Sequence, residues 1–232
     1  MPALLTAPAS NPKVAKNGKV GVLTSVLHLA PANLSGYEVC PGRSQGCTDA
    51  CLHYAGNPVY MNNKTKARVR RTKEFFEQRE TFMAQLEKEI AALERRAARL
   101  NLEPAVRLNG TSDIVWERKK CGNAANIMSL FPNVQFYDYT KLPRNPSNLP
   151  TNYHLTVSLS ESNQDKIEQA LDWGYNVAVV FENKLPDTYL GRPVISGDDH
   201  DYRPIDPKGS IVGLVVKGSK GKVDTSGFVV RL

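Results

Sequence analysis

Three cysteines, Cys40, Cys47 and Cys51, lie within twelve residues in the run CPGRSQGCTDAC, and the fourth, Cys121, lies far downstream. Thiolates are soft ligands that select iron–sulfur clusters, zinc or copper(I). A structural zinc site is closed by four ligands, whereas a cubane cluster held by three cysteines leaves one iron open. We therefore predict that the three loop cysteines bind a [4Fe–4S] cluster whose open iron accepts a substrate or another small exogenous ligand.

The spacing of the loop cysteines leaves alternatives. Six residues and then three separate them, which is neither a zinc knuckle nor a bacterial ferredoxin run. Pro41, Gly42 and Gly46 let the backbone fold back and direct N–H groups at cluster sulfurs. Zinc, a disulfide and free thiols remain alternatives, as does Cys121 as a fourth ligand. The start MPALLTAPASNPK lacks the features of a secretory signal, so we expect a cytoplasmic protein.

A basic helix is predicted after the cysteine loop. The 232-residue chain has a net charge of +7, and between Lys64 and Arg99 eleven basic residues face six acidic ones. Apolar residues recur there at steps of three, four or seven, which predicts one long helix packed on a core. Its basic face is either ordinary solvated surface or a contact for nucleic-acid phosphates or an acidic protein. No apolar run is long enough for a membrane span, so no membrane association is expected.

Strand-like and helix-like segments alternate along the rest of the chain. The apolar runs at 20–29, 105–109, 134–139, 153–159, 176–181 and 211–216 predict strands, and 124–130 and 165–173 predict helices. This alternation indicates parallel pairing with helical crossovers. We predict a single α/β domain over 1–232, with a flexible polar leader at 1–18. The expected architecture is a partial or distorted, TIM-like parallel (β/α) barrel, and an open doubly wound sheet is the alternative.

Polar residues follow several of these strands. Asn109, Asp113, Asp138 and Ser160 stand at or just after predicted strand ends. In parallel α/β proteins the carboxyl ends of the strands converge on one face, where sites are built. Because the cysteine loop also follows a strand, we predict that these four residues bind the cofactor or substrate in the same cavity mouth. Loop solvation and helix capping are the alternative explanation.

The stretch 191–209, GRPVISGDDHDYRPIDPKG, has the composition of a long ordered loop. Its Asp and His side chains could bind a hard metal or act in acid–base chemistry. The alternative is ion pairing of Arg203 with the aspartates of the same loop.

The runs CPGRSQGCTDACLHYAG, VRLNGTSDIVWE, FYDYTK, VSLSES and DDHDYRPIDPKGSIVGLVVKG together resemble the phage-encoded gene-product-eighty-eight-like proteins. The likeness runs from about Val20 to Lys217 and implies that the cysteine loop is the family's iron–sulfur site, in a host cytoplasm. At a coarser level, three cysteines after a first strand are similar to the site of radical S-adenosylmethionine enzymes. The CxxxCxxC motif of those enzymes differs in both gaps, and Ala50 stands where they have an aromatic residue.

Three functions follow from these observations. The first is an iron–sulfur protein with redox or sulfur chemistry at the mouth of an α/β barrel. The second is a zinc-stabilised nucleic-acid-binding protein that uses the basic helix, and its binding would weaken steeply with salt. The third is a radical enzyme that cleaves S-adenosylmethionine reductively.

Overall fold

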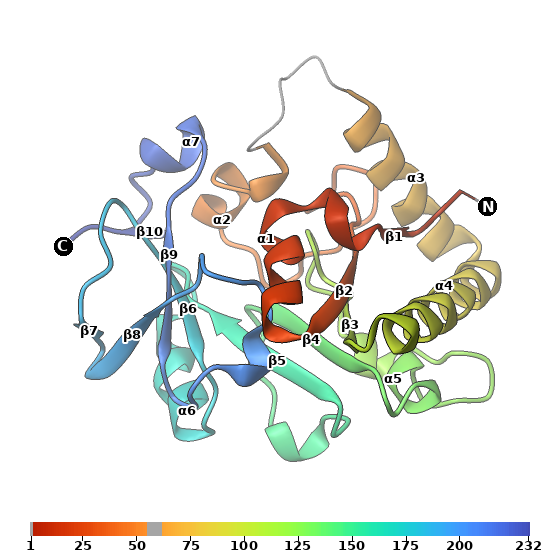
Figure 1. The fold of residues 1–232 in the computed structure, drawn as a ribbon. Coiled ribbons are helices and arrows are strands. Elements are labelled where there is room, and N and C mark those ends of the chain that lie inside the picture. The colour runs from red at the N-terminus through yellow and green to blue at the C-terminus, as the bar shows by residue number, and fades with distance from the viewer. Residues whose placement is uncertain (1, 55–61) are drawn as a thin grey trace.

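A largely parallel β-sheet forms the centre of the computed structural model, which describes residues 2–54 and 62–232 (Figure 1). The strand order is β1-β2-β3-β4-β5-β6-β9-β8-β7, and β10 pairs with β6. The strands are β1 (Leu5–Thr6), β2 (Val22–Leu27), β3 (Glu103–Arg107), β4 (Gln135–Thr140), β5 (Tyr153–Ser158), β6 (Val177–Phe181), β7 (Thr188–Tyr189), β8 (Arg192–Ser196), β9 (Ile211–Val215) and β10 (Val229–Val230). Within this order all neighbouring strands pair parallel except at the two edges, where β1 pairs antiparallel with β2 and β7 pairs antiparallel with β8. The mixed α/β class and the mostly parallel sheet are confirmed, and the ten-stranded sheet is not closed.

Helices and single turns fill the connections. The α-helices are α1 (Pro12–Ala15), α2 (Gln45–Asp49), α3 (Asn62–Glu77), α4 (Arg79–Leu100), α5 (Ile127–Leu130), α6 (Ile167–Asp172) and α7 (Ser219–Lys222). The 3-10 helices are η1 (Pro8–Ser10), η2 (Lys16–Val20), η3 (Leu52–Tyr54), η4 (Trp116–Arg118), η5 (Pro146–Asn148), η6 (Gln164–Lys166) and η7 (Arg203–Ile205). No helix in the described parts of the chain has the length and apolar character needed to cross a membrane.

The two faces of the sheet differ in polarity because successive side chains of a strand point to opposite sides. Val106 of β3 and Phe136 of β4 join the main apolar core, against which α4 packs. Their chain neighbours Arg107 and Tyr137 point to the other face, and both donate hydrogen bonds to the carboxylate of Asp201. The sheet therefore has an apolar face under helices and a face with a buried polar network.

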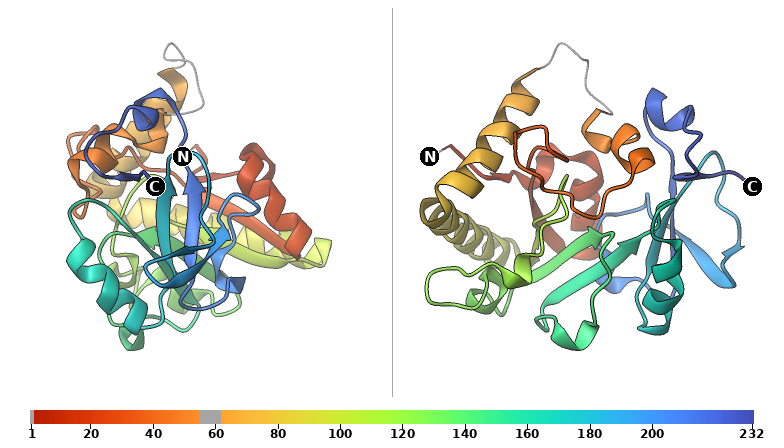
Figure 2. Two further views of the ribbon diagram at one scale, coloured as in Figure 1. Left: turned by 90° about the vertical axis from the view of Figure 1, so that its left-hand side faces the viewer. Right: turned by 180° about the vertical axis from the view of Figure 1, so that it is seen from behind.

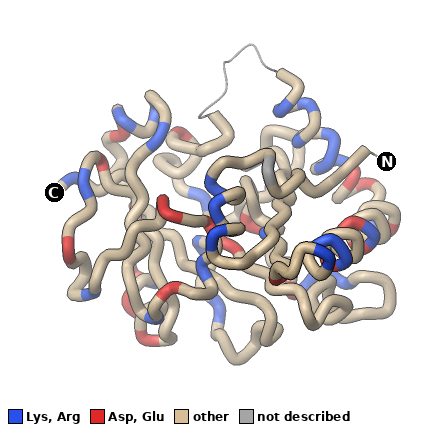
Figure 3. Tube along the Cα trace, in the orientation of Figure 1, with Lys and Arg blue, Asp and Glu red and all other residues tan. Residues whose placement is uncertain are grey.

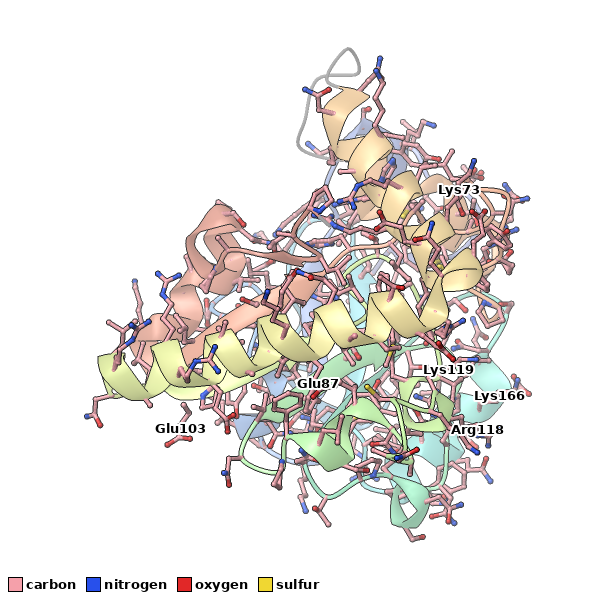
Figure 4. All side chains as sticks on the ribbon, turned by 90° about the vertical axis from the view of Figure 1, so that its right-hand side faces the viewer. Lys73, Glu87, Glu103, Arg118, Lys119 and Lys166 are labelled. Carbon is pink, nitrogen blue, oxygen red and sulfur yellow. The ribbon has the colours of Figure 1, made fainter. Side chains whose placement is uncertain are left out.

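The single long basic helix predicted from the sequence is wrong: the segment forms two helices, α3 and α4, that cross at a steep angle (Figure 4). Gln78 separates them with φ −134° and ψ 50°, outside the helical region. The break brings Phe75 and Phe82 into the same core, where their rings pack edge to face with centroids 5.4 Å apart. The apolar spacing continues through the bend, so the periodicity alone did not reveal it.

Residues 1–18 were expected to be a flexible polar leader, and the described part of this segment packs on the sheet instead. Leu4 is fully buried, and its N–H donates to the carboxylate of Glu89 on α4. Asn17 is also fully buried, and its side-chain oxygen accepts the N–H of Asp201 at 2.8 Å. The start of the segment thus packs beside α4 in the apolar core, and its end lies on the polar face of the sheet.

The stretch 191–209 was predicted to be loop, and its first part is strand β8. This strand pairs parallel with β9 and antiparallel with β7, and it is only partly buried. The prolines and glycines of this stretch led to the loop prediction, because both residues are disfavoured in central strands; near the edge of a sheet they are tolerated. The remainder, with η7, lies over the polar face.

Strand β6 extends beyond the carboxyl end of β5, whose last two residues pair with its first two. β5 pairs with β6 only at Val177 and Ala178, whereas β10 pairs with β6 at Val180 and Phe181. The C-terminal strand therefore takes the place next to β6 that β5 leaves. The right-hand view of Figure 2, from behind, shows α2 and α7 at the same end of the sheet.

Candidate metal centre

A cavity of about 260 Å³ lies at the carboxyl ends of the parallel strands. The loop after β2 and α2 form one wall, and the ends of β3, β4, β5, β6 and β9 form the others. Phe228, just before β10, completes the lining. The cysteine loop and part of the polar strand ends thus line one cavity.

All three loop cysteines line this cavity. Each is partly exposed and free of disulfide bonds. Cys121 lines no part of the cavity, and its side chain is 3% exposed in the main apolar core. Burial there raises the pKa of Cys121, as does the charge of Glu87 on α4 (labelled in Figure 4). The structure therefore groups three of the four thiols and sets the fourth apart.

Glu161, which follows β5, fastens the cysteine loop to the sheet. Its carboxylate accepts hydrogen bonds from the Ser44 hydroxyl and the Gly46 N–H, both at 2.7 Å. The Ser44 oxygen in turn caps α2 by accepting the Cys47 N–H at 3.2 Å. At Gly46 a side chain would meet Ser226 and would come within 2.6 Å of the Phe228 Cβ atom. The cysteine loop is thus clamped between the β5 end and the C-terminal segment.

Glu161→Ala is expected to loosen this clamp. Two hydrogen bonds to a charged acceptor are lost, each worth about 1.5–3 kcal/mol. Because Glu161 is partly exposed and water screens its charge, the free energy of unfolding should fall by less than their sum, about 2–4 kcal/mol. Metal loading of the loop cysteines should fall as well. Glu168→Ala, at an exposed position of α6, is the matched control and should leave both unchanged. Urea denaturation and metal analysis of the three proteins measure the effect, and equal loading of Glu161→Ala and the parent would exclude this positioning role.

The sulfur atoms have both apolar and polar surroundings. Burial raises the pKa of Cys40 to about 12, although the Ala32 N–H, at 3.4 Å from its sulfur, acts in the opposite direction. Burial likewise raises the pKa of Cys51, and the His53 N–H and the cation of Arg68 oppose it. The Cys47 thiol also raises the pKa of both Cys40 and Cys51, and the Cys51 thiol raises that of Cys40. Backbone donors and a cation are the groups that stabilise thiolates when a cluster binds.

Among residues 2–54 and 62–232, no three Cys, His, Asp or Glu side chains converge tightly enough to hold one metal ion. Around one tetrahedral zinc the sulfurs would stand roughly 3.8 Å apart, given Zn–S bonds of about 2.3 Å. A cubane places each cysteine on a different iron, so its ligands stand further apart. These are the ligand spacings that zinc and a cluster would each require of Cys40, Cys47 and Cys51.

Two of the four strand-end residues predicted to bind a cofactor line the cavity, Asn109 and Asp113. The Asn109 side chain is occupied by its own loop: its oxygen accepts from Ser112, Ile114 and Trp116 at 2.8–3.0 Å. Asp113 is 7% exposed, and one carboxylate oxygen accepts the Lys141 N–H at 2.8 Å. Its Oδ1 atom is buried and has no hydrogen-bond partner among the described residues.

The other two, Asp138 and Ser160, are 1% exposed and are not part of the lining. Asp138 accepts the Asn109 N–H at 2.6 Å and the Tyr153 hydroxyl at 2.9 Å, and burial raises its pKa to about 7. The Ser160 N–H donates to Asn163 within its own turn. Both residues support the loops behind the cavity from positions that a ligand does not reach in this structure.

Sequence reasoning missed the cations of the cavity. Lys13 of α1, Arg107 of β3 and Lys217 after β9 all line it (Figure 3 shows the basic residues near α1). A charged residue within the strand AVRLN was one available signal, because an arginine in a buried strand needs a partner. Nothing in the sequence indicated that Lys13 would reach the same place.

The acidic loop, for which a hard-metal or acid–base role was considered, is occupied by ion pairs. Asp201 binds Arg107, Asp206 binds Arg203 at 3.0 Å, and Asp198 binds Lys217 at 2.6 Å. His200 is held by Arg203 at 2.8 Å between Nδ1 and Nη2. These contacts match the alternative explanation, ion pairing within the loop, and extend it to β3 and β9.

The basic residues of α3 mostly contact their own chain. Lys64 and Arg68 bind His53, Arg70 binds Glu74, and Arg71 binds the Ala3 carbonyl. Lys66 and Lys73 are exposed, and Figure 4 shows Lys73 on the outside of α3. A nucleic-acid or acidic protein partner at this helix remains a prediction. Of the basic residues of α3, only Lys66 and Lys73 are exposed for such a contact.

The family model described as Gene product 88 matches residues 3–232. Comparisons with curated proteins and with solved structures find no match. They give no support to the likeness to radical S-adenosylmethionine enzymes. The resemblance carried by the cysteine loop and the four further runs is confirmed by a match over nearly the whole chain, and the protein belongs to the Gene product 88 family.

Proposed function

We propose that the protein binds a [4Fe–4S] cluster through Cys40, Cys47 and Cys51 and uses it in redox or sulfur chemistry on a small molecule in the adjoining cavity. The observation that carries the proposal is that three thiols of one loop line one cavity while Cys121 is buried elsewhere. Three thiolates leave one iron of a cubane without a protein thiolate. When bound, such a cluster supplies an electron carrier or a Lewis-acidic iron.

The residues around the thiols support an anionic cofactor. Three thiolates bring negative charge, and the cations of Arg68 and Lys141 both act to lower the pKa of Cys51. The Lys141 ammonium donates to the Ser158 hydroxyl at 3.0 Å and lies over the Phe228 ring, and among the described residues it forms no ion pair with a carboxylate. The Ala32 and His53 N–H groups near sulfur are donors of the kind that tune a cluster's reduction potential.

We also infer that the sheet is a partial barrel. Its polar face holds a buried network between Arg107, Tyr137 and Asp201, and the cavity opens at the strand ends of that face. A barrel interior with its site at the carboxyl ends has the same arrangement. Free thiols and an oxygen-sensitive cofactor persist in a reducing compartment, which supports a cytoplasmic location.

Anaerobic reconstitution with iron and sulfide tests the proposal. We expect about four iron and four sulfide ions per chain, a brown colour that is lost on iron chelation, and a paramagnetic signal after one-electron reduction. Colourless protein that retains one zinc ion per chain after the same treatment would overturn the cluster assignment. Cleavage of S-adenosylmethionine under strong reduction would extend the proposal to radical chemistry.

A further inference from the structure

Two cations of the cavity wall share one carboxylate. The Oδ1 atom of Asp201 is 3.1 Å from Nη1 of Arg107 and 3.7 Å from Nζ of Lys13. Asp201 is almost fully buried, whereas the side chains of Lys13 and Arg107 are 25% and 16% exposed, and both line the cavity. One negative charge thus faces two positive charges where the wall meets the open space.

The neighbouring carboxylates do not restore the balance. Asp198 is bound to Lys217 at 2.6 Å, and Asp206 is bound to Arg203 at 3.0 Å. The pKa of Lys13 is lowered to about 8, mainly by burial; the carboxylates of Asp201 and Asp198 raise it, and the cations of Arg107 and Arg203 lower it. An incompletely compensated charge in a partly desolvated wall is costly unless a counterion binds.

The arrangement of the pair suits an oxyanion. The Arg107 guanidinium lies over the Tyr139 ring at 4.7 Å, which fixes its plane, and it uses Nη1 for Asp201. A fixed guanidinium beside an ammonium is a recognised combination for phosphate and carboxylate groups. Asp113 lies in the same cavity, and its buried Oδ1 atom has no hydrogen-bond partner among the described residues.

We propose that Lys13 and Arg107 form a subsite for an anionic group, a phosphate or a carboxylate, on the small molecule that enters the cavity. The inference deepens the proposed function and rests on it in one respect, that the cavity beside the loop cysteines receives the substrate. The substrate class is therefore an anionic small molecule that is held by its oxyanion at the wall formed by α1 and β3.

Calorimetric titration of the full chain with inorganic phosphate, and separately with acetate, tests the subsite at constant ionic strength in chloride. Lys13→Gln should weaken binding by about tenfold or more, the effect of losing one charge-assisted contact. Lys19→Gln removes a charge from an exposed position of η2 and should bind as the parent does. Lys13→Arg keeps the charge and should retain binding. The arm with the tighter binding, phosphate or acetate, identifies the group.

Two results would overturn the subsite: a parent protein that binds neither anion, or a Lys13→Gln variant that is folded and binds as the parent does. The two proposals fail separately. A protein with serine at all three loop cysteines should lose iron and bind the anion as the parent does, whereas Lys13→Gln should bind the anion about tenfold or more weakly and keep its iron. If the parent protein binds the anion but takes up no iron, the cluster proposal would be rejected and the anion subsite would be retained.

Discussion

Serine at any one of the three loop cysteines is expected to lower the iron content of the reconstituted protein from about four atoms per chain to fewer than one. The reason is geometric: the three thiols come from one loop and line one cavity, so when one is lost the remaining two leave a second iron of the cubane without a protein ligand. The colour and the paramagnetic signal should disappear with the iron. Iron and sulfide analysis after anaerobic reconstitution measures the effect.

Cys121→Ala provides the matched control. This thiol is buried in the apolar core and is not part of the cavity lining, so alanine keeps the site apolar and removes only a sulfur. Its iron content should equal that of the parent. A loss of iron in Cys121→Ala, or full iron in Cys47→Ser, would contradict the assignment of ligands, provided that circular dichroism shows both variants to be folded.

The position of the site could be predicted from the sequence because parallel strands leave little freedom. Buried strands such as 22–27 and 211–215 alternate with helices, and their carboxyl ends must then lie at one edge. Three thiols that follow the first long strand of the parallel sheet had to reach that edge. The cavity at the strand ends, with the cysteine loop as one wall, is the physical result.

The residues that face the cavity could not all be predicted, because a single position decides the direction of a strand side chain. Asp138 and Tyr139 both stand near the end of β4, yet Tyr139 lines the cavity and Asp138 points into the interior behind it. Proximity to a strand end does not distinguish the two. The register of β4 against β5 was needed for that.

The cationic wall depends on contacts across the whole chain, which explains why local patterns gave no sign of it. Lys13 and Asp201 are far apart in the sequence, and Asn17 joins their segments through the Asp201 N–H at 2.8 Å. The short α1 begins with Asn11 as its cap and Pro12 in its first turn, so its helical character is local. Its position over the polar face, in contrast, depends on tertiary contacts such as those with Asp201.

Asp201→Asn is expected to destabilise the protein more than Arg107→Met does. The asparagine removes the one carboxylate that two cations share and leaves both uncompensated, which costs about 3–5 kcal/mol. Arg107→Met leaves Asp201 with Lys13 and with the Tyr137 hydroxyl at 3.0 Å, so its cost should be smaller, about 2–3 kcal/mol. The double variant should recover part of the loss, because its wall then carries a single cation. Urea denaturation of the single and double variants measures the coupling.

The pH dependence of Asp201→Asn has a definite sign. Burial alone would raise the pKa of Asp201, but Arg107 and Lys13 hold it below its usual 3.8. A carboxylate with a lowered pKa stabilises the fold above its unfolded value, and this stability is lost as the pH falls through the folded value. The difference in unfolding free energy between the parent and Asp201→Asn should therefore be full at pH 6 and shrink below about pH 4.

The exposed pair Lys217 and Asp198 is the control for this prediction. Its ammonium and carboxylate are 2.6 Å apart, but the side chains are 55% and 31% exposed. Water screens such a pair, so Asp198→Asn should cost no more than about 1 kcal/mol. Equal costs for Asp198→Asn and Asp201→Asn would show that Asp201 balances no surplus charge, and would remove the electrostatic basis for an anion at Lys13 and Arg107.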